Sequence, residues 1–399
     1  MSQTDHTDQA QSASAKTVIW NDPTFRSIVS QVLAAGVLVW FFYTIFSNTL
    51  SNMERQGITT GFAFWNSTAG YGILMSLIDY DSTDTYGRTF FVGLLNTVLI
   101  SVLGIFFATI IGFIVGVARL SKNWPIAKIA TVYVETLRNI PLLLQILFWY
   151  NAVLRTLPHP RDSLTLGESI FLNSRGLYLP SPVPGLGFGF VSSAFYLAVV
   201  VVFIMVRWAN KRQEETGQQF PSFWASVGLL IAFPGVVFLI MGAPMTLDYP
   251  ALKGFNFQGG IGIIPELLAL LWALTFYTAT FIAEIVRAGI LGVSHGQTEA
   301  AHALGLRNGP TLRLVVIPQA MRIIIPPLTS QYLNLAKNSS LATAIGYPDL
   351  VAVFMGTTLN QTGQAVEIVG ITMAVYLVMS LAISGLMNWF NKRMALSER

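Results

Sequence analysis

Residues able to do covalent or metal chemistry are few in this chain. None of its 399 residues is cysteine, which excludes a thiolate nucleophile, a disulfide and a cysteine metal site. The four histidines, His6, His159, His295 and His302, lack the close spacing of a metal site. No glycine is followed by lysine, so a Gly-x-x-x-x-Gly-Lys phosphate-binding loop is absent. The sequence predicts a protein that is not an enzyme and holds no cofactor or metal.

Charged side chains inside apolar blocks are the next candidates. Glu135 and Arg138 are three residues apart, and so are Glu284 and Arg287, a spacing at which one helix pairs its own charges. We expect both pairs to be structural. A charge at the centre of a membrane helix costs about 2.5–3.5 kcal/mol, so we expect neighbouring amides and the protein interior to shelter Lys337.

Uncharged amides near proline kinks are candidates for a substrate pathway. Gln331 and Asn334 are three residues apart on an expected helix that contains two prolines, and Gln145 follows Pro141 in another. Proline frees a carbonyl and bends a helix, and broken helices often line pathways. A polar solute crossing a dry interior needs side chains that replace its water without binding it too tightly. Gln331, Asn334, Gln145 and Lys337 are therefore the predicted pathway residues.

The polar stretch SHGQTEAAHALGLRNGPT, residues 294–311, has the pattern of two short helices joined by a tight turn. Ser294 and Gln297 have the spacing of a capping box, and Gly305 suits a left-handed helix end. An Asn-Gly pair is expected to turn the chain, and Pro310 to begin the second helix. The stretch is too short and too tethered to read a DNA groove.

Long apolar blocks must position these residues. The chain is 53% hydrophobic and 11% charged, which is more apolar side chain than a soluble core hides. The blocks suit a hydrocarbon core of roughly 30 Å at 1.5 Å per residue. The predicted fold class is an all-α integral membrane protein with about eight transmembrane helices. We expect them over 28–46, 90–117, 129–153, 191–206, 223–241, 264–285, 323–341 and 366–390.

Local composition refines this plan. Ala108, Gly112 and Gly116 recur every four residues and predict a close packing face. The Pro/Gly-rich stretch 180–190 is expected to be a flexible outer loop. Lysine and arginine concentrate in alternate loops, which places residues 1–27 and 392–399 in the cytoplasm. The polar start lacks the pattern of a cleavable signal peptide, so the first apolar block is predicted to be a retained anchor.

Five residues carry a resemblance to a known family. Glu299, Ala300, Ala301, Gly305 and Pro318 match the EAA loop of ABC importer permeases. The segments GLLNTV at 93–98, ETLRNIPLLLQ at 135–145 and NLAKNSSLATAIGYPDL at 334–350 are similar to the polar amino-acid (His/Glu/Gln/Arg/opine) permease family. Within that family, the layout is most similar to the Q-type permease subunit of general L-amino-acid transporters.

The resemblance implies a type I ABC importer permease with a five-helix core and about three additional helices. The core would comprise 87–155 and 264–391, with the coupling loop at 287–318. Residues 28–86 would supply the first helix and a periplasmic loop, and 156–263 two extra helices between periplasmic loops. The implied function is import of L-amino acids across the bacterial inner membrane by alternating access.

The implied partners follow from the same resemblance. They are a homologous permease subunit, two ATPase subunits, a periplasmic amino-acid-binding protein, the L-amino-acid substrate and the lipid bilayer, with no nucleic acid. Two other functions remain open from the residues themselves. One is an ion-coupled secondary carrier, which leaves the EAA match unexplained, and the other is a structural or sensory subunit that moves nothing.

Overall fold

The computed structural model describes residues 23–55, 57 and 60–394, and its long elements are helices. Within this part, seven helices are long and apolar enough to cross a membrane, or eight if one bent pair counts as a span. The prediction of an all-α membrane protein with about eight spans is confirmed. The single helices are α1 (Pro23–Arg55), α2 (Tyr86–Ala118), α5 (Phe188–Thr216), α6 (Ser222–Ile240), α7 (Pro265–Leu291), α10 (Ile317–Asn338) and α12 (Ala365–Met394). Most of the expected tail 1–27, and residues 395–399, lie outside the described part.

The bent pair corresponds to the third expected span. Helix α3 (Trp124–Asn139) and α4 (Leu142–Leu147), which continues as a π-helical turn over Phe148–Leu154, meet at an angle of 104°. The break falls at Ile140 and Pro141, where the backbone is extended. Proline has no N–H to continue the helix and disfavours helical geometry in the residue before it. The kink predicted at Pro141 is confirmed, and it divides the expected span over 129–153 into two helices.

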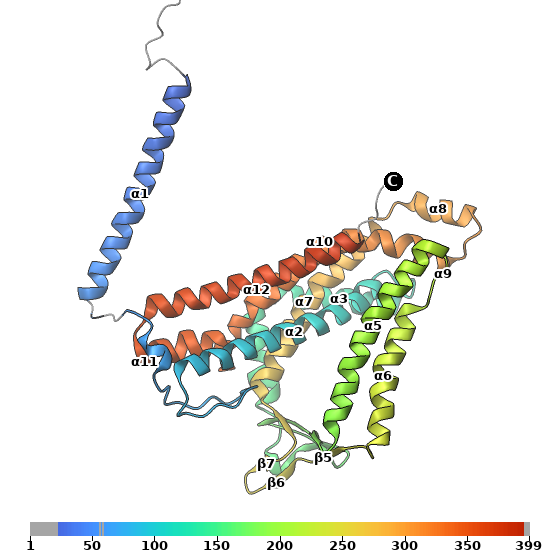
Figure 1. Ribbon diagram of the computed structural model, residues 1–399, viewed down its shortest axis with the longest axis horizontal. Helices are drawn as coiled ribbons and strands as arrows, with labels where there is room; N and C mark the ends of the chain where they lie inside the picture. Colours follow the sequence, from blue (N-terminus) through green and yellow to red (C-terminus); the bar gives the residue numbers. More distant parts are fainter. Residues whose placement is uncertain (1–22, 56, 58–59, 395–399) are drawn as a thin grey trace, which may run out of the picture.

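Helices α2 and α7 lie along each other at the centre of the bundle, with α10 packed on α7 and α12 on α10 (Figure 1). The predicted small-residue face makes the central contact. Ala108 is fully buried, and a Cβ added at Gly112 would lie 2.6 Å from the Cβ of Ile282. At Gly116 the added atom would lie 2.7 Å from the backbone oxygen of Ala283. The predicted packing face is confirmed, because only glycine leaves room for α7 at these positions.

The chain between α10 and α12 folds back against α2. It comprises 3-10 turns over Ser339–Ile345, a π-helical turn over Val351–Thr358 and the short helix α11 (Leu359–Thr362). The amide of Asn96 donates to the Pro348 carbonyl at 2.9 Å, and the Leu350 N–H donates to the Thr97 hydroxyl at 2.9 Å. Two of the segments that resemble the permease family, 93–98 and 334–350, are therefore in direct contact.

Strands occur only between the added helices and the core, within the described residues. Strands β1 (Leu164–Leu166), β2 (Ile170–Asn173), β3 (Gly176–Leu179) and β8 (Ile261–Ile263) form one antiparallel sheet in that order. Two further pairs are β4 (Ser181–Pro184) with β5 (Met245–Asp248), and β6 (Ala251–Lys253) with β7 (Asn256–Gln258). Because β4 lies within 180–190, the expectation of a wholly flexible loop there is wrong.

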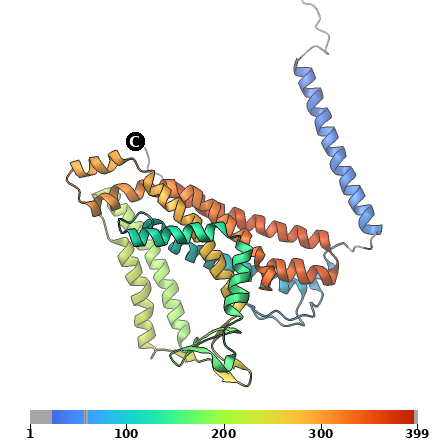
Figure 2. The same ribbon diagram turned by 180° about the vertical axis from the view of Figure 1, so that it is seen from behind.

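The added helices stand at the two sides of the core. Helix α1 is set apart from the bundle, and Met53 is its one buried residue (Figures 1 and 2). Helices α5 and α6 form a hairpin whose helices pack on each other above the strands. The exposed apolar surface of these helices fits a hydrocarbon environment.

The α2–α7 contact predicts a sharp response to one methyl group. The substitution Gly116→Ala should cost about 1–3 kcal/mol by overpacking, since the atom it meets is backbone and has little freedom to move. A lower thermal midpoint of the purified protein would show this. The matched control is Gly36→Ala in α1, where nothing lies within 4 Å of the added atom. Equal midpoints for the two variants would contradict the packing argument.

Candidate coupling loop and polar recess

The first candidate site is a short helix at one end of the molecule. Helix α8 (His295–Ala303) follows α7 after only Gly292, Val293 and Ser294, and it projects beyond the bundle (Figure 1). Gly305, two residues after its last residue, has a φ of +78°. The Leu306 N–H donates to the Ala301 carbonyl at 3.1 Å, and the Gly305 N–H to His302 at 2.9 Å. This pair of bonds is a Schellman ending, so the predicted left-handed position of Gly305 is confirmed.

The other end of α8 differs from the expected pattern. Ser294 precedes the helix but makes no side-chain capping bond, so the predicted capping box is wrong. The Gln297 side chain instead accepts a hydrogen bond from the Gln319 amide at 3.1 Å, which joins α8 to α10. The Asn-Gly turn is also wrong, because α9 (Asn308–Thr311) already contains both residues and Pro310 lies inside its single turn. A π-helical turn over Leu312–Val316 then leads into α10.

The predicted coupling residues divide between two faces of this loop. Ala301 is buried, whereas Glu299 and Ala300 are exposed. The Glu299 carboxylate lies 2.9 Å from Nδ1 of His295, one turn earlier. Pro318 is half-buried in the first turn of α10. Glu299 and Ala300 thus form a small acidic surface that no other element of the described chain covers.

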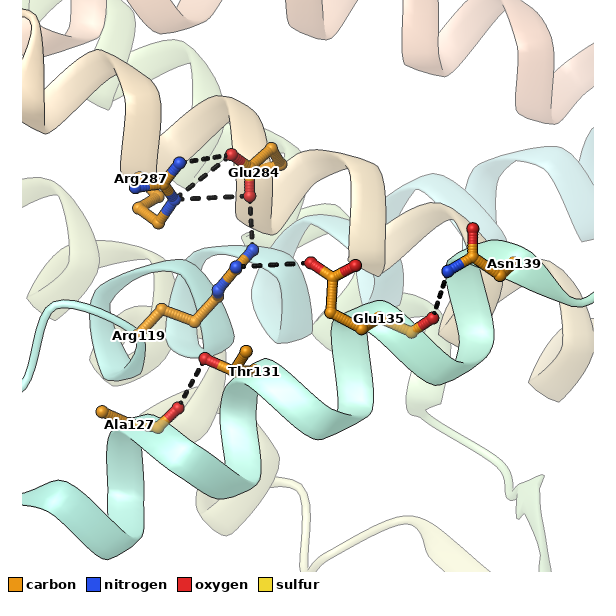
Figure 3. A network of polar contacts seen from close by, with 7 residues as sticks. All are labelled: Arg119, Ala127, Thr131, Glu135, Asn139, Glu284 and Arg287. Atoms are coloured by element: carbon orange, nitrogen blue, oxygen red, sulfur yellow. Dashed lines mark hydrogen bonds and ion pairs between the residues drawn. The ribbon is translucent and has the colours of Figure 1, made fainter.

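A charge cluster lies one to two helical turns before this loop (Figure 3). The Arg287 guanidinium lies 2.6 Å from the Glu284 carboxylate, which confirms this predicted pair. The expected pair of Glu135 with Arg138 is wrong, because Glu135 lies 3.6 Å from Arg119 instead. Arg119 also donates to Glu284. It therefore joins the end of α2 to both α3 and α7.

Arg119 was not singled out from the sequence, although a signal for it exists. It lies three residues after Gly116, so it continues the helical face that packs on α7. An arginine on a packing face needs a partner on the opposing helix. Its side chain is only 11% exposed, and Glu284 of α7 meets that need.

The second candidate site is a polar recess of about 280 Å³ between α7 and α10. Its lining residues are Tyr277, Thr278, Phe281, Gln331, Asn334 and Asn338. Gln331 and Asn334 are two of the four predicted pathway residues, and the structure brings them together there. Within the described residues, the side chains of Gln331, Asn334 and Asn338 form no hydrogen bond, which leaves their donors and acceptors free.

The other two predicted pathway residues lie elsewhere. Gln145 is 4% exposed, and its amide donates to the carbonyls of Leu137 at 2.8 Å and Ile140 at 3.0 Å. It therefore satisfies carbonyls freed by the break at Pro141, a structural role. Lys337 is exposed and does not line the recess, so the expected shelter for its charge is wrong for this chain.

Long apolar helices around a polar recess, with a capped surface helix at one end, define a membrane transport subunit. Residues 212–396 match the family described as binding-protein-dependent transport system inner membrane component. The chain is 54% identical over 382 residues to the putative amino-acid ABC transporter permease protein YhdX of Escherichia coli (strain K12), covering 95% of this chain and 96% of that protein. The chain belongs to the amino-acid ABC transporter permease family and is a multi-pass inner-membrane protein.

Further comparisons give a second close relative and a structural neighbour. The general L-amino acid transport system permease protein AapQ of Rhizobium johnstonii is 54% identical over 378 residues, covering 95% of this chain and 94% of that protein. A crystal structure of an amino acid ABC transporter with histidines aligns with a TM-score of 0.46 at 22% identity, covering 77% of this chain and 95% of that one. The resemblance inferred from the EAA loop and its neighbours is confirmed by the relatives.

The two arginines of the charge cluster should differ in their effect on stability. Arg119→Gln removes a charged hydrogen bond to α7 and an ion pair with α3, and should cost about 1.5–3 kcal/mol. Arg287→Gln removes a pair within one helix on a side chain that is 33% exposed, and should cost less than about 1 kcal/mol. Thermal midpoints of the two purified variants compare them directly. A larger loss for Arg287→Gln would rule out Arg119 as the joint between these helices.

Proposed function

We propose that this protein is the transmembrane permease subunit of an ATP-driven importer that carries L-amino acids into the cytoplasm. The observation that carries the proposal is the EAA sequence on α8, a rigid, exposed helix attached to α7. Membership in the amino-acid ABC permease family supports the substrate class, since the relative AapQ is described as a general L-amino acid transport permease.

The proposed partners supply the activities that a permease subunit needs from other proteins. Two ATPase subunits would hydrolyse ATP. They would bind the exposed surface formed by Glu299 and Ala300. A homologous permease would complete the pathway, and a periplasmic amino-acid-binding protein would deliver the substrate. The chain contains no phosphate-binding loop of its own.

The proposed orientation places α8 in the cytoplasm. The end of α12 lies near α8 (Figure 1), so the C-terminal lysine and arginine share that side with the coupling loop. Arg119, Lys122 and Lys128 lie around the turn between α2 and α3. Positive charge concentrated on one side favours the cytoplasm.

Two connections would transmit a movement of α8 to the substrate path. One is the three-residue link to α7, and the other is the Gln297–Gln319 hydrogen bond to α10. Because α7 and α10 form opposite walls of the polar recess, a displacement of α8 would change the width of the recess. This displacement is the proposed physical basis for alternating access driven by rigid-body motion.

The function is tested by uptake into vesicles that contain the whole transporter. Labelled amino-acid uptake should require internal ATP and the binding protein and should survive an uncoupler. The variant Glu299→Lys should lower copurification of the ATPase about tenfold or more without unfolding the protein, since the side chain is 70% exposed and contacts only its own helix.

The matched control for the coupling face is Glu215→Lys on α5. Glu215 is also exposed and also pairs with a residue one turn earlier, Lys211. This variant should leave copurification unchanged. Uptake that collapses with the uncoupler but ignores ATP would instead identify an ion-coupled carrier.

The pathway proposal makes a separate prediction for the recess. Gln331→Leu should reduce amino-acid uptake at least several-fold, because an apolar side chain replaces an unbonded amide in a recess of about 280 Å³. Labelled uptake and the relative rates for several amino acids are the measurements. Ser193→Leu on the exposed face of α5 is the control. Unchanged rate and selectivity for Gln331→Leu would remove this residue from the pathway.

A further inference from the structure

Arg138 is a charged residue without an acidic partner at the edge of the recess. Its guanidinium carbon lies 5.6 Å from the centre of the Phe281 ring, and Phe281 lines the recess. The nearby acid Glu135 pairs with Arg119 instead. Among the described residues, Arg138 forms no ion pair. Stacking on an aromatic ring leaves the N–H donors in the guanidinium plane available.

The position of Arg138 makes this free charge informative. Phe281 lies ten residues before the end of α7, roughly 15 Å along the helix at 1.5 Å per residue. Arg138 itself is in the last turn of α3, directly before the break at Pro141. The Arg138 side chain is exposed, so its guanidinium can be reached from outside this chain. An accessible, unpaired guanidinium beside the recess is suited to binding an anionic group of a ligand.

The groups around the recess complement one another chemically. The guanidinium offers paired donors that match the two oxygens of a carboxylate. The α10 wall offers the amide oxygens of Gln331, Asn334 and Asn338, which accept hydrogen bonds from an ammonium group. An amino acid carries one carboxylate and one ammonium group. The recess and Arg138 together thus present partners for both ends of a zwitterion.

We propose that Arg138 binds the α-carboxylate of the transported amino acid, while the amides of α10 receive its ammonium group. The proposal rests on the proposed function and adds a substrate-anchoring residue to it. The carboxylate and the ammonium group are common to all amino acids. A site that binds only these two groups does not discriminate between substrate side chains. Such a site accepts L-amino acids broadly and rejects molecules that lack the carboxylate.

The test compares an amino acid with its α-amide. The probes are labelled L-glutamine and the α-amide of L-glutamine, and the protein is the complete transporter in lipid nanodiscs without the binding protein. Arg138→Gln should raise the Kd for glutamine about 10- to 100-fold, as expected for loss of charged hydrogen bonds. The Kd for the amide should change less than about threefold. Arg138→Lys should retain part of the preference, because it keeps the charge without the paired donors.

A stacked arginine elsewhere provides the matched control. The Arg207 guanidinium carbon lies 4.3 Å from the centre of the Phe203 ring on α5, and Arg207→Gln should leave both Kd values unchanged. If Arg138→Gln raises the Kd values of both probes by the same factor, Arg138 does not bind the carboxylate. Absence of saturable glutamine binding by the unaltered complex would also overturn the assignment.

The proposed function and the anchoring role of Arg138 would be contradicted by different results. If the unaltered transporter takes up no amino acid with ATP and the binding protein present, the proposed function itself is wrong. If uptake is normal but Arg138→Gln keeps the preference for the acid over the amide, only the anchoring role is wrong.

Discussion

Close contact between α2 and α7 is the constraint on which the rest of the structure depends. Glycines at 112 and 116 let Ile282 and Ala283 of α7 lie directly against the α2 backbone. Lipid provides no hydrophobic force to hold helices together, so van der Waals contact of this kind carries the association. Arg119 continues the same face into charged contacts with α7 and α3. The central pair thus fixes where α3 crosses, and α3 carries Arg138 to the edge of the recess.

Irregular backbone is tolerated in this protein where side chains form hydrogen bonds with its free carbonyl and N–H groups. The break between α3 and α4 leaves free carbonyls, and these accept hydrogen bonds from the Gln145 amide. The segment after α10 is held by Asn96 and Thr97 of α2, and the Tyr347 hydroxyl donates to the Asn96 carbonyl at 3.0 Å. Non-helical chain at membrane depth is possible only with such partners. Polar residues that look suited to a pathway can therefore be structural, as Gln145 is.

The sequence predicted the features that local pattern determines. Apolar length located the spans, the small-residue repeat located the packing face of α2, and the EAA loop identified the family. Gly305 was correctly assigned because a left-handed ending is a local requirement. The pairing of Glu135 with Arg119 was missed because residues on two different helices meet only after packing. The fold-back after α10 likewise depends on residues of α2 that lie far away in the sequence.

The strands that flank the α5–α6 hairpin have an architectural consequence. Leu179 at the end of β3 is the register partner of Ile261 at the start of β8, so the chain leaves and re-enters the core region at neighbouring points. The segment between those residues is an insertion whose two ends lie side by side. A short turn could bridge the same gap, and the fold can therefore gain or lose this module without rerouting the polypeptide through the transport machinery.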